Sequence, residues 1–103
     1  MTLTSRERAA LRAEAHHLSP IVHVGHQGFT PTLLQTIDDA LRTHELVKIA
    51  LARTTDVKPK DASRDVAEQL GADVVQTIGR TCTLYRENPD LKRKAGALPP
   101  WRS

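Results

Sequence analysis

The sequence predicts an α/β fold: a compact single-domain sandwich in the order α-β-α-β-α-β-β, with a mixed four-stranded sheet. Three observations lead to this prediction. Segments with helical periodicity alternate with short β-branched runs, helix-capping residues stand at the expected boundaries, and two strand-like segments are separated only by Gly79-Arg80. Such a turn closes an antiparallel hairpin, whereas β-α-β units allow parallel pairs with right-handed crossovers, so both kinds of pairing are expected.

The first helix and the first strand have clear boundary signals. Thr4 and Glu7 have capping-box spacing and the apolar residues that follow share one stripe, so a helix is predicted over residues 4–17. Pro20 ends this helix, because proline lacks an amide hydrogen and disfavours helical angles in the residue before it. The β-branched run IVHV at 21–24 then predicts a strand.

The second helix and the second strand come next along the chain. Thr30 is a favourable N-cap and Pro31 stands at the first helical position, so a helix is predicted through about Thr43. In the segment LVKIALA at 46–52, Val47, Ile49 and Leu51 alternate with Lys48 and Ala50, which predicts a strand. Lys48 points away from the apolar side of this strand, so we expect it on an exposed sheet face or edge.

The third helix and the hairpin complete the predicted fold. The polar, proline-containing stretch 53–60 predicts a loop. The helix predicted over 60–70 ends before Gly71, which is a typical C-terminal cap. Residues 73–78 and 81–86 are then expected to form the two strands of the hairpin.

The composition excludes several classes of protein. The chain of 103 residues is 39% hydrophobic and 26% charged, which is typical of one globular domain. No apolar run approaches the ~20 residues of a membrane span, and the N-terminus lacks the core of a secretion signal. We therefore expect a cytoplasmic protein without membrane contact. One cysteine excludes an internal disulfide, and three aromatic residues are too few for stacking against many bases.

No residue pattern indicates a catalytic or metal site. The five histidines are not accompanied by a second cysteine or by an H-E-x-x-H motif. Asp38 and Asp39 are adjacent on a helix and therefore point about 100° apart, which does not suit a shared carboxylate site. Cys82 lies within a predicted strand, and no neighbouring residue would activate it. We expect no enzyme activity, no metal, no cofactor and no small-molecule substrate.

The net charge of +3 is unevenly distributed. Residues 1–45 hold four arginines and five acidic residues, a net of −1, whereas residues 46–103 hold eleven basic and seven acidic residues, a net of +4. We expect a domain over residues 1–88 and a basic, flexible tail over residues 89–103. This distribution favours a polyanionic partner such as nucleic acid. A solvated basic surface without a partner fits the charge equally well.

The strongest local motif is GHQG at 25–28, between the first strand and the second helix. Gly25 and Gly28 permit unusual backbone angles and close approach of another backbone. The loop opens onto the helix that Thr30 caps, where amide groups and a partial positive charge suit a phosphate. KH domains clamp nucleic acids with a G-x-x-G loop. Because the pattern is short, a plain strand-to-helix turn is the alternative interpretation.

Two further segments accompany this motif in a fixed order. The three segments are the L-x-P-x-x-x-x-G-x-x-G-x-T run at 18–30, HELVK at 44–48 and IGRT-x-x-LYR at 78–86. Together they closely resemble the stand-alone bacterial CRM-domain proteins of the YhbY type, over about residues 4–88. The resemblance implies a fold similar to the C-terminal domain of translation initiation factor three, and RNA binding without catalysis. For bacterial members it also implies an association with precursors of the large (50S) ribosomal subunit.

The resemblance implies that the G-x-x-G loop contacts RNA. His26-Gln27 departs from the small, polar or basic residues that the family often carries at these positions. Phe29 either stacks on a base or plugs the helix against the sheet. Basic residues elsewhere are candidates for phosphate contact, with a solvated charge as the alternative for each. The expected RNA-binding residues are Gly25, His26, Gln27, Gly28, Phe29, Thr30, Lys48, Arg53, Lys58, Lys60, Arg80 and Arg86.

The sequence therefore favours a monomeric RNA-binding protein that acts in assembly of the large ribosomal subunit, with ribosomal RNA of the precursor as its partner. The alternative is an adaptor that docks on ribosomal proteins or assembly factors through an exposed sheet face or a helix. A DNA-binding domain is less favoured, because no helix-turn-helix spacing is visible.

Overall fold

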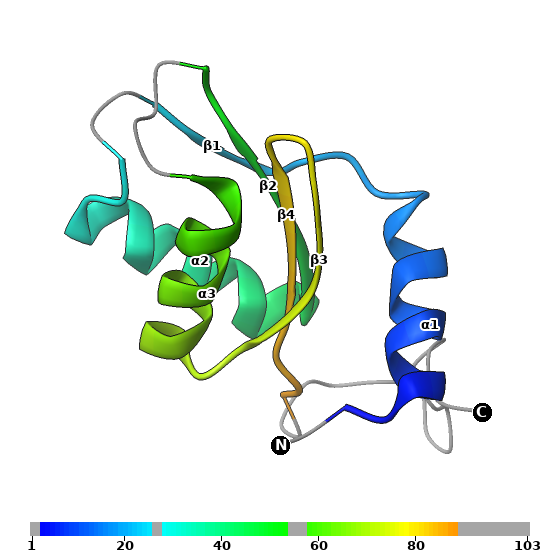
Figure 1. Cartoon of the computed structure of the whole chain (residues 1–103). Helices are drawn as coiled ribbons and strands as arrows, with labels where there is room; N and C mark the ends of the chain where they lie inside the picture. Colours follow the sequence, from blue (N-terminus) through cyan, green and yellow to red (C-terminus); the bar gives the residue numbers. More distant parts are fainter. Residues whose placement is uncertain (1–2, 26–27, 54–57, 89–103) are drawn as a thin grey trace.

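The computed structural model describes residues 3–25, 28–53 and 58–88, and the predicted order of helices and strands is confirmed (Figure 1). The predicted tail, residues 89–103, lies outside the described residues. The observed boundaries differ from the predicted ones by at most two residues. The elements are α1 (Ser5–Ala15), β1 (Val22–Val24), α2 (Pro31–His44), β2 (Leu46–Leu51), α3 (Pro59–Leu70), β3 (Asp73–Ile78) and β4 (Thr81–Tyr85).

Capping residues fix the helix ends as the sequence predicts. The hydroxyl of Thr4 accepts the amide hydrogen of Glu7 at 3.0 Å, and the Glu7 carboxylate accepts that of Thr4 at 3.1 Å, which completes the capping box of α1. The hydroxyl of Thr30 accepts the Leu33 amide hydrogen at 3.1 Å and begins α2. Gly71 ends α3 with a left-handed φ of 65°, which glycine adopts without steric cost.

The four strands form one mixed sheet in the order β1-β2-β4-β3. β1 is parallel to β2, whereas β4 is antiparallel to both β2 and β3. β4, the last strand of the described residues, is therefore inserted between β2 and β3. Ile78 pairs with Thr81, so the predicted two-residue turn Gly79-Arg80 is confirmed.

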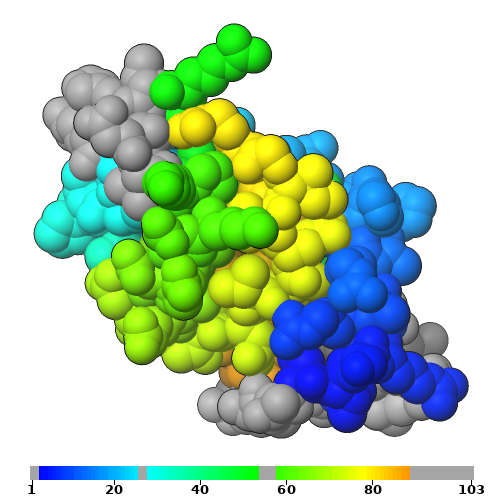
Figure 2. Space-filling model, in the orientation of Figure 1, coloured from blue at the N-terminus to red at the C-terminus, as the bar shows by residue number. Residues whose placement is uncertain are grey.

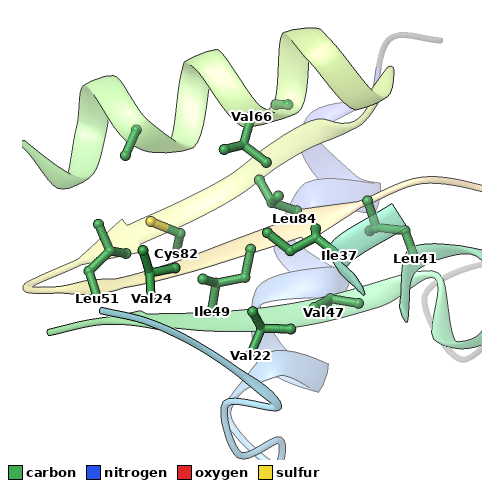
Figure 3. Packing of buried hydrophobic residues seen from close by; sticks show 12 residues of the cluster. Val22, Val24, Ile37, Leu41, Val47, Ile49, Leu51, Val66, Cys82 and Leu84 are labelled. Atoms are coloured by element: carbon green, nitrogen blue, oxygen red, sulfur yellow. The ribbon is translucent and has the colours of Figure 1, made fainter. Parts of the chain in front are cut away.

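The larger core lies between the sheet and the two helices α2 and α3 (Figure 3). Val22, Ile49 and Leu84 from three strands pack with Ile37 of α2 and Val66 of α3, and none of these side chains is more than 4% exposed. Burial of each such side chain contributes roughly 1.5–3 kcal/mol. This cluster attaches both helices to one face of the sheet and so fixes the direction in which their N-termini point.

The opposite face of the sheet is only partly covered. α1 packs Leu11 and Ala15 against Leu46, Val75 and Tyr85, which lie toward one end of this face. In the described part of the chain, no second helix covers the remainder, toward the β3–β4 turn (Figure 1). The two faces therefore differ: two helices cover one, and a single helix covers part of the other.

Candidate functional site

One end of the sheet brings together most of the residues that the sequence predicts to be functional. β1 and β2 both end there, and the amide of Ala52 donates to the carbonyl of Val24 at 2.9 Å. The β3–β4 turn reaches the same end, since the Leu51 amide donates to the Arg80 carbonyl at 2.8 Å. We call this region the loop end; it comprises Gly25, Gly28, Phe29, Thr30, Arg53, Lys58, Lys60, Gly79 and Arg80.

The loop before α2 uses some of its amide groups internally. The Gly28 amide donates to the Gly25 carbonyl at 3.0 Å, and the Thr30 amide donates to the Gly28 carbonyl at 3.2 Å. Among the described residues, the amides of Phe29 and Thr32 have no hydrogen-bond partner. Pro31 supplies no donor, so among the described residues of α2 and its loop these two amides are the ones that can bind an anion.

The two glycines of the motif differ in what the fold requires of them. Gly28 has a φ of 71°, in the left-handed region, which a side chain would disfavour. Gly25 is outside that region, and a Cβ atom added to it would meet no atom within 4 Å. The described structure therefore gives no internal reason for glycine at position 25. The middle residues of the motif, His26 and Gln27, lie outside the described residues.

The start of α3 contributes cationic side chains to the loop end. Lys58 and Lys60 line a shallow hollow of about 500 Å³ that extends to Gly79 at the hairpin turn. In Figure 2 the surface of the hairpin (yellow) lies beside that of α3 (green). No ion pair or side-chain hydrogen bond within the described residues engages Lys58, Lys60 or Arg53. No described side chain therefore competes with a ligand for these three charges.

Two further residues of the loop end have contacts inside the fold. The guanidinium of Arg80 donates to the carbonyl of Ala52, with Nε at 3.2 Å and Nη2 at 2.7 Å, and Nε also donates to the carbonyl of Leu51. Arg80 therefore ties the hairpin turn to the end of β2. Phe29 is half-buried and packs against the larger core, which favours the plug over the base-stacking interpretation.

The structure separates two predicted residues from the loop end. Lys48 lies in the middle of β2 on the face that α1 partly covers, and its ammonium donates to the carbonyl of Leu18 at 3.2 Å. Arg86 lies at the other end of the sheet. Its guanidinium donates to the Asp38 carboxylate at 2.7 Å, to the Leu70 carbonyl at 2.9 Å and to the Asp38 carbonyl at 3.0 Å.

Sequence reasoning missed the polar network around Arg86. The Glu45 side chain is buried, and its carboxylate accepts the Asn88 amide hydrogen at 2.7 Å, while the Glu45 carbonyl accepts that of Arg86 at 2.9 Å. Glu45 also has a φ of 63° at the end of α2. We call Asp38, Glu45, Arg86 and Asn88 the clamped end. No local sequence signal indicates it, because its partners are more than 40 residues apart.

The Cys82 thiol is buried, and its pKa depends on that burial. Burial raises the pKa of the Cys82 thiol, an effect that a hydrogen bond from Ser63 (2.6 Å) partly offsets, so the thiol is a poor nucleophile at neutral pH. Within the described residues, no three histidine, cysteine or acidic side chains are grouped as metal ligands. No described helix has the length and apolar composition that a membrane crossing requires.

Comparison with protein families assigns the chain to a known domain family. A model described as the CRS1 / YhbY (CRM) domain matches residues 3–86, which is most of the chain. The chain belongs to this family. The match includes all the described residues of the loop end.

Individual relatives extend over nearly the whole chain. Probable RNA-binding protein YqeI of Bacillus subtilis is 33% identical over 91 residues, covering 88% of this chain and 95% of the relative. An RNA-binding protein of Haemophilus influenzae is 34% identical over 91 residues, covering 88% and 92%. The solution structure of the hypothetical protein SAV1595 from Staphylococcus aureus aligns with a TM-score of 0.67 and 30% identity, over 95% of this chain and all of that one. This similarity confirms the predicted fold class.

Proposed function

We propose that this protein binds RNA through the loop end and holds phosphates of the RNA backbone there. The proposal rests on one observation: backbone amides and cationic side chains without described partners lie at the same end of the sheet. The amides of Phe29 and Thr32, at the start of α2, have no partner among the described residues, and the cations of Arg53, Lys58 and Lys60 lie at the same end of the sheet. Full-length relatives that are described as RNA-binding proteins support the proposal.

The proposed mechanism is positional rather than catalytic. The N-terminus of α2 carries a partial positive charge, so a phosphate at the two amides is stabilised by hydrogen bonds and by the helix dipole. The basic side chains of the loop end add attraction that does not depend on base sequence. RNA affinity should therefore fall as salt rises, with a slope of about 0.7–0.9 in log–log terms for each phosphate neutralised. Arg86 is outside this interface, because its guanidinium is engaged by Asp38 and Leu70.

The RNA that we propose is structured, with double-stranded or junction character. The chain has three aromatic residues. Phe29 packs against the core and Tyr85 is buried. Few rings are thus left to stack on splayed bases, whereas phosphate contacts read the shape of a folded RNA. Following the family resemblance, we propose ribosomal RNA of the large-subunit precursor as the partner, a role for a monomer in assembly of that subunit, and a cytoplasmic location.

The test is RNA binding by the Gly25→Asp variant, measured by fluorescence anisotropy with fragments of large-subunit ribosomal RNA. Position 25 tolerates a side chain without steric conflict, so circular dichroism and urea unfolding should match those of the wild-type protein. A carboxylate beside the phosphate should reduce affinity at least about tenfold, because a juxtaposed like charge costs several kcal/mol. Gly25→Asn is the matched control, since it has the same size without the charge and should bind more tightly than Gly25→Asp.

Two results would contradict the proposal. A folded Gly25→Asp protein that binds RNA as tightly as the wild-type protein would place the RNA away from the loop. Absence of RNA binding by the wild-type protein at low salt would instead favour the adaptor hypothesis. A preference for ribosomal RNA over unrelated structured RNA of equal length tests the identity of the partner separately.

A further inference from the structure

A second polar hollow lies on the sheet face that α1 leaves uncovered. The pairing register places Lys48, Thr83 and Gln76 in one row across β2, β4 and β3. The next row toward the hairpin turn contains Thr81 and Ile78. These side chains and His16, which follows the last residue of α1, line a hollow of about 160 Å³. It is on a different face from the larger core and is separate from the hollow at the start of α3.

A buried hydroxyl lines this hollow, and no described residue forms a hydrogen bond with it. The Thr83 side chain is 1% exposed, and its hydroxyl has no hydrogen-bond partner among the described residues. The side chains of Gln76 and Thr81, which line the same hollow, likewise have no partner in the described part of the chain. Burial of a polar group without a partner costs about 1–3 kcal/mol, so a buried hydroxyl usually has a ligand or a water molecule.

The charge around the hollow favours an anion. Lys48 carries the positive charge at its rim; one of its three N–H groups donates to the Leu18 carbonyl at 3.2 Å, and the other two can donate to a ligand. His16 adds a ring N–H that can donate a hydrogen bond. None of the described side chains that line the hollow is acidic. A ligand suited to these groups accepts several hydrogen bonds and carries negative charge, as a phosphate does.

We infer that this hollow binds a second phosphate of the same RNA, so that the RNA passes from the loop end over the hairpin turn onto the open sheet face. The inference rests on the proposed function and names a further contact for it. Continuity supports it: Thr81 directly follows Arg80 of the loop end, and Thr83 lies about 7 Å further along β4. The exposed Ile78 beside the hollow supplies apolar surface for a ribose or a base edge.

The test compares two variants of the hollow with a charge control. Thr83→Val removes the buried hydroxyl at nearly constant shape, and Lys48→Met removes the charge at the rim. Arg42→Met is the control, because it removes a charge from an exposed pair with Asp39 on α2. Anisotropy with large-subunit ribosomal RNA fragments is measured for each variant over a range of salt concentrations. Circular dichroism and urea unfolding check the fold of each variant.

We expect Thr83→Val to weaken RNA binding about tenfold while it leaves the fold intact, since a hydrogen bond to a charged acceptor is lost. Thr83→Ser keeps the hydroxyl and should retain most of the affinity. Lys48→Met should lower the log–log salt slope by about 0.7–0.9, whereas Arg42→Met should not change the slope.

Three results would overturn the inference. In the first, Thr83→Val and Lys48→Met bind RNA like Arg42→Met, while Gly25→Asp loses binding; the proposed function then stands and only the second phosphate is lost. In the second, Lys48→Met weakens binding but Thr83→Val does not, so the lysine acts from a distance and the hollow is empty of phosphate. In the third, Thr83→Val destabilises the free protein, which would mean that the hydroxyl serves the fold.

Discussion

The two ends of the sheet use the same kinds of residue in opposite ways. At the clamped end, Arg86 and Asp38 bind each other, and Glu45 accepts the amide hydrogen of Asn88. At the loop end, Arg53, Lys58 and Lys60 have no ion-pair partner within the described residues. A count of basic residues alone would not distinguish the two ends. The difference teaches that a basic residue is available for a ligand only where the fold does not already use its donors.

The largest change in stability that tests this comparison is expected at the clamped end. Arg86→Met should lower the free energy of unfolding by about 2–3 kcal/mol, because charge-assisted hydrogen bonds to Asp38 and Leu70 are lost from a side chain that is only 23% exposed. Urea unfolding measures the change. The salt slope of RNA binding should stay as in the wild-type protein.

The control for this variant is Arg42→Met. The pair Arg42–Asp39 is at the surface, with side chains that are 62% and 49% exposed, so its loss should change the free energy of unfolding by less than about 1 kcal/mol. If Arg86→Met were as stable as Arg42→Met but bound RNA with a lower salt slope, the roles assigned to the two ends would be reversed for this residue.

The next effect concerns the charges of the loop end. Lys58→Met and Lys60→Met should each lower the log–log salt slope of RNA binding by about 0.7–0.9 without a change in stability. Their side chains are exposed and make no contact that the described fold needs. Anisotropy titrations at several salt concentrations give the slopes. Unchanged slopes in both variants would mean that the RNA does not reach the start of α3.

A smaller effect distinguishes the two glycines of the motif. Gly28→Ala should lower the free energy of unfolding by about 1–2 kcal/mol, because its φ of 71° disfavours a side chain. Gly25→Ala should leave stability within about 0.5 kcal/mol, because the added Cβ meets no atom within 4 Å. Paired urea unfolding curves measure both changes. Equal losses of stability would show that the fold, and not the ligand, requires glycine at both positions.

Much of the fold could be predicted from the sequence because its signals are local. Thr4, Thr30 and Gly71 mark helix boundaries within a few residues of the chain, and Gly79-Arg80 alone predicts the hairpin. The loop end could be predicted in part, since the G-x-x-G motif precedes a capped helix. That Arg53 and the start of α3 share this end depends on strand order, which local patterns do not specify.

The remainder could not be predicted because it depends on contacts between distant residues. β4 is inserted between β2 and β3, and this insertion brings Thr83 into a row with Lys48. Arg86 and Asp38 are 48 residues apart, so the sequence offers Arg86 as a free cation although the fold engages it. The sequence predicts Lys48 on an exposed face or edge, whereas the fold half-buries it on the partly covered face. Only the tertiary structure shows whether a charged side chain is engaged within the fold or free to bind a ligand.

The smallest effect is expected at Cys82, which lies in β4 between the two ends of the sheet. Burial raises the pKa of its thiol above the ordinary value, so thiolate is scarce in the folded protein and reaction with a disulfide reagent at pH 8 should be slow until urea unfolds the chain. The folded state holds the thiol proton more tightly than the unfolded state. The free energy of unfolding should therefore fall slightly as pH rises above the ordinary thiol pKa. Equal reaction rates in the folded and unfolded protein would contradict this burial and, with it, the packing of β4 under α3 on which the loop end depends.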